Sequence, residues 1–160
     1  MSIGIRAVVI PLRLFLAVLF AVLVLFQVMS LPGQFAHMAQ ESPESAYLRW
    51  PLTIVSIFWV LCIQAVVVAT WKLLTMVARN AIFTRASLIW VDVITWSIVA
   101  AWVVLVGVFL YVGFGADDPG LPLLLFLLVV IVAVAGLLMI VMRTLLGQAT
   151  ELRTDMDAVI

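Results

Sequence analysis

A single carboxylate lies inside one of the most apolar stretches of the chain. The segment "NAIFTRASLIWVDVI" at residues 80–94 places Asp92 four residues beyond Leu88, where an apolar run begins. At about 1.5 Å of rise per helical residue, Asp92 would lie roughly 6 Å inside that run. An unpaired carboxylate is costly to bury in an apolar medium. We therefore expect Asp92 either to have a basic partner or to bind a proton or a cation.

Several basic residues lie near the ends of apolar runs, close to the level expected for Asp92. Arg13, near the start of the first apolar run, is the expected partner of Asp92, with Lys72 and Arg85 as alternatives that reach inward. Gln64 would add an amide hydrogen bond. We favour structural pairing over a role for Asp92 in proton transport. A proton relay needs several ionisable groups along a path, and the apolar runs have none in the half that lies away from these basic residues. The predicted polar cluster inside the apolar runs is Asp92, Arg13, Gln64 and Lys72.

Other chemistry-bearing residues are sparse and isolated. His37 is the only histidine, and a metal site there would need Glu41 and Glu44 in an unusual arrangement. Cys62 is the only cysteine, which excludes an intrachain disulfide and fits a small buried hydrophobe. Nucleophile and base pairs, phosphate-cradling loops and paired catalytic carboxylates are missing from the sequence. We expect no enzyme, no cofactor and no metal.

The composition is that of a membrane protein. Hydrophobic residues make up 68% of the chain and charged residues 10%, against about 45–50% and about 25% in globular proteins. Four apolar stretches reach the roughly 20 residues that a helix needs to cross a bilayer, at residues 12–29, 51–71, 88–112 and 121–142. The sequence predicts an all-α protein, one transmembrane domain over residues 1–160 that folds as an integral membrane four-helix bundle.

The distribution of basic residues predicts the orientation. The net charge is zero, so no basic field favours direct nucleic acid binding. Arg49 alone lies beside the acidic loops between spans one and two and between spans three and four. The positive-inside rule then makes this a multi-pass protein of the cell membrane with both termini cytoplasmic. The other seven basic residues fall on the opposite side: Arg6, Arg13, Lys72, Arg79, Arg85, Arg143 and Arg153.

The two outer loops have different expected structures. In "ESPES", Ser42 can cap a helix whose first position is Pro43, which predicts a short helix that runs towards Trp50. The second loop, "GFGADDPG", has the glycine, proline and aspartate content of a tight reversal.

The tail at residues 143–160 carries an amphipathic pattern. Apolar residues recur there at steps of four and three, which is a helical stripe. We expect a short amphipathic cytoplasmic C-terminal helix that continues span four, with a bend permitted at Gly147. Its acidic polar face disfavours attachment to lipid headgroups. The stripe consists of Leu145, Ala149, Leu152, Met156 and Val159.

The hairpin at residues 77–87 offers this tail complementary charges and apolar contacts. We hypothesise that the tail and the hairpin form a platform for a soluble partner, although a tail that packs only on its own helices explains the stripe equally well. The predicted platform residues are Arg79, Ile82, Phe83, Arg85, Leu152, Met156 and Val159.

Four motifs together resemble a bacterial family of four-span membrane proteins called domain of unknown function 2975. They are "NAIFTRASLIWVDVI", "YLRWPL", "ADDPG" and the end "ELRTDMDAVI". The family pattern has a glycine where this chain has Asn80, followed by a phenylalanine and a hydroxyl residue, matched by Phe83 and Thr84. The resemblance implies the bacterial inner membrane, assigns no activity, and suggests a small helix-turn-helix regulator as a partner.

Two functions from different classes remain. The favoured one is protein–protein interaction in the lipid bilayer, as membrane anchor or regulator of a cytoplasmic partner or as accessory subunit of a membrane complex, with a homo-oligomer left open. The alternative is a transporter or channel component with Asp92 as proton or cation site. The fourth span, "LPLLLFLLVVIVAVAGLLMIVM", contains no polar side chain, which argues against a water-filled path along it.

Overall fold

The structure is a computed structural model that consists of helices and short connections. It describes residues 3–41, 43–79, 81–115 and 117–159. Side chains are described throughout these ranges except at Ile3, Ile5, Ser30, Leu31, Pro32, Phe35, Ala39, Ser45, Ala46, Leu48, Arg49 and Val159. The predicted helix cap at Ser42 therefore lies outside the described residues, as does Asn80.

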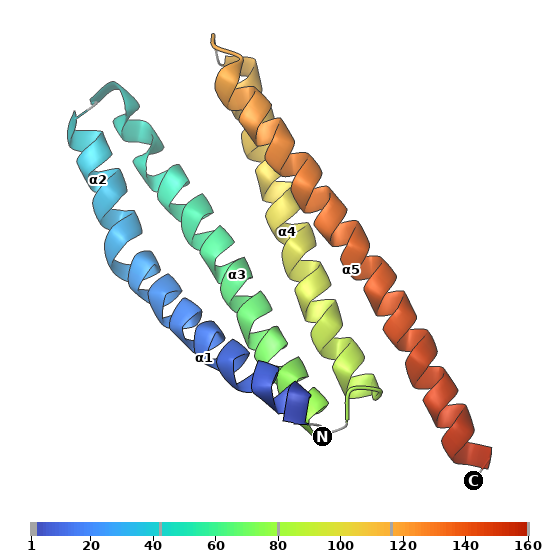
Figure 1. Cartoon of the computed structure of the whole chain (residues 1–160). Helices are drawn as coiled ribbons and strands as arrows, with labels where there is room; N and C mark the ends of the chain where they lie inside the picture. The colour runs from blue at the N-terminus through green and yellow to red at the C-terminus, as the bar shows by residue number, and fades with distance from the viewer. Residues whose placement is uncertain (1–2, 42, 80, 116, 160) are drawn as a thin grey trace.

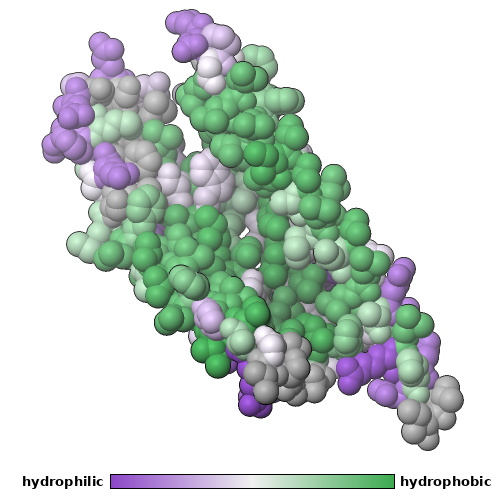
Figure 2. Space-filling model, viewed as in Figure 1, coloured by the Kyte–Doolittle hydropathy of each residue, from purple (hydrophilic) through white to green (hydrophobic). Residues whose placement is uncertain are grey.

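Within the described residues, four helices are long and apolar enough to cross a membrane, as the composition predicted. These segments are Arg6–Met29, Trp50–Ala78, Arg85–Gly115 and Gly120–Ala158. Their side chains cover the middle of the visible face with apolar surface, while polar residues gather towards the two ends (Figure 2). Such a surface suits a multi-pass membrane protein, because only lipid tails solvate so much apolar area without cost.

The first span is longer than predicted and does not end in a loop. Helix α1 (Ile3–Leu25) continues through a π-helical segment, η1 (Phe26–Ser30), into α2 (Leu31–Glu41). Pro32 has no N–H to donate to the carbonyl four residues earlier, so the regular α-helical pattern cannot pass through it unchanged. The wider π turn ends at Ser30, two residues before this proline, and the chain stays helical across it.

The next segments follow the predicted order. A 3-10 helix, η2 (Pro43–Leu48), starts at the expected proline and leads into α3 (Arg49–Ala78). Helix α4 (Arg85–Gly115) begins after Thr84, whose main-chain oxygen accepts hydrogen bonds from the Ser87 amide and hydroxyl. The reversal before α5 (Gly120–Val159) is tight, and the Asp118 carboxylate accepts a hydrogen bond from the Gly120 amide.

The C-terminal segment corrects the expected architecture. Helix α5 runs without a break over 40 residues, so the described part of the tail forms no separate short amphipathic C-terminal helix. Gly147 lies inside it and does not end it. One glycine costs a helix only about 1 kcal/mol relative to alanine. Once a helix has formed, each added residue gains a hydrogen bond, so the tail extends span four.

The long helices pack side by side in an open row and not as a closed bundle (Figure 1). Helices α1 and α2 pack on α3, α3 packs on α4, and α4 packs on α5. Within the described residues, α1 and α5 at the two edges share no extensive contact. Lipid solvates an apolar helix face as well as another apolar helix does, so no hydrophobic force closes the row. Both chain ends lie at one end of the row (Figure 1). We call it the basic end, because seven of the eight basic residues belong to this side of the spans.

Candidate functional site

An ion pair joins α4 and α5 near the basic end. The Arg143 Nε donates to Asp92 Oδ1 at 2.8 Å, and Nη2 lies 3.5 Å from Oδ2. The two contacts come from one guanidinium to both oxygens of one carboxylate, which is the geometry that makes arginine pairs directional. The side chains remain 45% and 40% exposed, so the pair lies on the surface of the helix pair. Asp92 is thus held by a basic residue, as predicted, but by a different one.

Arg13 is not the partner of Asp92. Its Nη2 donates to Thr75 Oγ1 at 2.8 Å, and its guanidinium lies 5.3 Å from the centre of the Trp71 ring. Both neighbours belong to α3. The expectation was wrong because helices in an open row meet only their neighbours, and α3 lies between α1, which carries Arg13, and α4, which carries Asp92.

The other residues of the predicted polar cluster are also dispersed. The Lys72 ammonium lies 6.0 Å from the centre of the Trp90 ring on α4. Gln64 is buried on α3, and its Nε2 has no hydrogen-bond partner among the described residues. It lies eight residues from Lys72, roughly 12 Å along the helix. Neither residue joins the Asp92 pair, and the sequence signal of shared depth did not reveal which helices meet.

Two tryptophans make hydrogen bonds that the sequence did not indicate. The Trp59 indole on α3 donates to the Ala101 carbonyl on α4 at 3.2 Å, and the Trp102 indole donates to the Val129 carbonyl on α5 at 3.1 Å. The acceptors are main-chain carbonyls, which every residue has, so no sequence pattern marks them.

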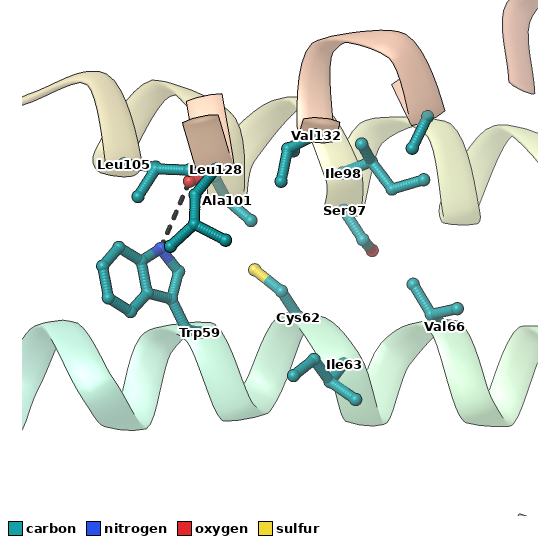
Figure 3. Close-up of a pocket in the computed structure, with 11 residues that line it drawn as sticks. Trp59, Cys62, Ile63, Val66, Ser97, Ile98, Ala101, Leu105, Leu128 and Val132 are labelled. Carbon is teal, nitrogen blue, oxygen red and sulfur yellow. Dashed lines mark hydrogen bonds between the residues drawn. The ribbon is translucent and has the colours of Figure 1, made fainter. Parts of the chain in front are cut away.

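A cavity of about 460 Å³ lies where the middle parts of α3, α4 and α5 approach one another (Figure 3). The two polar groups in its wall already donate hydrogen bonds to main-chain carbonyls: the Trp59 indole to that of Ala101 and the Ser97 hydroxyl to that of Val93. The Cys62 side chain points into the space between the helices (Figure 3). The remaining wall is aliphatic: Ile63, Val66, Ile98, Ala101, Leu105, Leu128, Val132 and Ala135. Such a cavity suits an apolar group better than a polar reactant.

The end of α5 contacts the hairpin between α3 and α4. The Arg153 guanidinium lies 5.6 Å from the centre of the Phe83 ring. Leu152 and Met156, four residues apart on one face, are 64% and 67% exposed. Arg79 and Arg85 are exposed and Ile82 is half-buried, while the Val159 side chain lies outside the described residues. The structure thus brings the tail to the hairpin through Arg153 and leaves the apolar stripe largely open.

The outer histidine has a local neighbour. His37 Nε2 lies 3.4 Å from Glu41 Oε1, one helical turn along α2. In the described parts of the chain, no three side chains of histidine, cysteine, aspartate or glutamate come together to hold a metal ion.

Comparison with known proteins places the chain in a family. No curated protein and no solved structure matches it. A family model described as "Protein of unknown function (DUF2975)" matches residues 33–160, which include α3, α4, α5 and most of α2 but not α1. The matched range covers well over half of the sequence and includes all four motifs that resemble this family. The chain belongs to the DUF2975 family of proteins of unknown function.

Proposed function

We propose that this membrane protein is not an enzyme and acts by binding a soluble protein at the end of α5. The docking surface, here called the tail platform, consists of Leu152 and Met156 together with the hairpin residues Ile82 and Phe83. Both termini and the platform are proposed to be cytoplasmic, because seven of the eight basic residues lie at this end of the spans.

The exposed apolar stripe on a continuous helix is the observation that supports this proposal. Leu152 and Met156 lie one turn apart, before and after Arg153, whose guanidinium contacts Phe83. An amphipathic helix face of this kind is a common element of protein recognition. Packing on the protein's own helices, the other explanation of the stripe, would require these two side chains to be covered.

The charges around the stripe favour a partner with a basic surface. Glu151, Asp155 and Asp157 are exposed on the same turns of α5. An anionic membrane surface would repel them, which disfavours headgroup attachment. A protein with an apolar pocket bordered by lysine or arginine would complement them, and a basic helix-turn-helix regulator has that chemistry.

A transport function has less support. Asp92 is the one acidic residue well inside the spans, and Arg143 already occupies both of its carboxylate oxygens. Proton or cation binding there would have to displace a guanidinium. The cavity between α3, α4 and α5 is apolar and does not continue this pair into a polar path.

Site-specific photo-crosslinking in cells tests the proposal. A crosslinker replaces Met156, and a control crosslinker replaces Leu123, which is equally exposed at the opposite end of the same helix. We expect position 156 to capture a soluble protein with a basic surface, and position 123 to capture lipid. Asp155→Lys with Asp157→Lys should abolish that capture.

Two results would refute the platform. One is that position 156 crosslinks only to lipid or to this chain itself. The other is that the captured protein still crosslinks at full yield after both acidic residues have been reversed.

A further inference from the structure

A second surface, unrelated to the tail platform, lies between α1 and α3. It is a cleft of about 320 Å³. Leu16, Ala17 and Phe20 form one wall, and Val67 and Val68 form the other. The cleft therefore runs along the apolar part of two spans, where lipid tails are the surrounding medium.

Two cations lie at the basic end of this cleft. Lys72 lines the cleft itself. Arg13 lies three and four residues before Leu16 and Ala17, so all three share one face of α1. Arg13 is also fixed in place, because Thr75 accepts one of its hydrogen bonds and Trp71 lies against its guanidinium.

Neither cation is neutralised within the described residues. The ion pairs there are those of His37 with Glu41 and of Arg143 with Asp92. A guanidinium has five N–H donors, and Arg13 gives one to Thr75 while its Nε has no partner in the described part of the chain. Lys72 interacts with the Trp90 ring, which attracts a cation but leaves its net charge unbalanced.

We propose that this cleft binds one anionic phospholipid. The phosphate lies between the Arg13 and Lys72 side chains, and one acyl chain follows the walls formed by Leu16, Phe20 and Val68. A ligand for this cleft must be anionic at one end and apolar along the rest, because two cations lie at one end of a cleft whose walls are aliphatic. Free phosphate matches only the first part, and a soluble protein cannot enter the second. Basic pockets between membrane helices are known binding sites for anionic headgroups.

Native mass spectrometry of the full-length protein with added phosphatidylglycerol or phosphatidylcholine of the same chains tests this proposal. We expect one tightly bound phosphatidylglycerol. The double change Arg13→Gln with Lys72→Gln should weaken it about tenfold or more, since each basic residue near anionic lipid contributes several-fold. The matched control, Arg6→Gln with Arg79→Gln, removes two exposed charges from the same end outside the cleft. Its binding should stay within about twofold of the native value.

A second pair of variants tests the apolar part while both cations remain. Ala17→Trp fills the cleft and should also lose the lipid, whereas Val18→Trp, on the neighbouring exposed position, should not. An excess of inorganic phosphate should not displace phosphatidylglycerol. Equal losses in the two double variants, equal binding of phosphatidylcholine, or displacement by phosphate would each overturn the proposal. Unchanged melting temperatures of the variants would show that a loss of lipid binding does not come from unfolding.

Discussion

Arg143 reaches across from α5 to Asp92 on α4 and holds its carboxylate with an Nε to Oδ1 distance of 2.8 Å. The two residues are 51 positions apart in the sequence. Antiparallel helices with apolar faces can slide past each other at little cost in lipid, because each register buries a similar surface. A directional ion pair at one level fixes a single register, so Asp92 and Arg143 set how α5 lies along α4.

Removing either member of this pair should destabilise the protein by leaving the other charge unpaired. Asp92→Ala and Arg143→Ala should each lower the melting temperature in detergent. The double variant should recover part of the loss, because residues in direct contact are energetically coupled. As a control, Asp92→Ala combined with Arg13→Ala should be additive to within about 0.5 kcal/mol. Coupling to Arg13 in place of Arg143 would contradict the geometry.

The indole hydrogen bonds should contribute measurably to helix association. Trp102→Phe keeps the aromatic ring but removes the donor to the Val129 carbonyl. We expect a loss of about 1 kcal/mol in unfolding free energy, measured by chemical denaturation in mixed micelles. Trp59→Phe should behave alike. Trp96→Phe is the matched control, since that side chain is 71% exposed, and a comparable loss there would contradict this assignment.

Close approach of α4 and α5 should make Gly136 sensitive to side-chain size. A Cβ built at Gly136 would lie 3.4 Å from the Ile98 Cγ2, so Gly136→Ala should be tolerated with a small adjustment. Gly136→Leu should destabilise by about 1–3 kcal/mol through overpacking. Gly107, also inside a helix, has nothing within 4 Å of such a Cβ. Gly107→Leu should therefore leave the melting temperature unchanged, and equal effects at both glycines would exclude a packing cause.

The contact between Arg153 and Phe83 should hold the end of α5 in place. A spin label at Ala158 reports its motion. Phe83→Ala should increase the mobility of that label, because an exposed cation–π contact contributes about 0.5–1 kcal/mol. Phe114→Ala, which removes an exposed ring at the far end of α4, should leave the mobility of the label unchanged. An unchanged spectrum in Phe83→Ala would show that the ring does not restrain the tail.

The orientation can be checked with a membrane-impermeant thiol reagent in a Cys62→Ser background. Ser87 is fully buried, so the neighbouring exposed Ala86 is the better position for a cysteine at the basic end. Glu44→Cys reports the opposite end. We expect labelling of position 44 in intact cells, and of position 86 only after permeabilisation. Labelling of position 86 in intact cells would reverse the proposed topology.

The sequence by itself determined the class of protein and the number of candidate spans. Runs of about 20 apolar residues have one stable solution in a bilayer, a helix, because open strands leave main-chain groups unpaired in lipid. Turn composition likewise predicted the reversal before Gly120 and the helix start at Pro43. These features depend on local chemistry, which is written residue by residue. The continuous helical segment from Ile3 to Glu41 was missed, because a proline after the first apolar run predicts a break and the π turn before it gives no separate signal.

Only the tertiary structure decided which helices meet and which charges pair. The four spans are apolar on nearly every face, so no stripe in the sequence distinguishes a face that packs on protein from one that faces lipid. Arg13 and Arg143 are at similar depths, and depth was the only information available for choosing a partner for Asp92. The open row separates Arg13 from Asp92 and brings Arg143 to it. The same arrangement leaves Arg13 beside the cleft of α1 and α3, because the position of a helix in the row, and not its composition, determines which side chains it can reach.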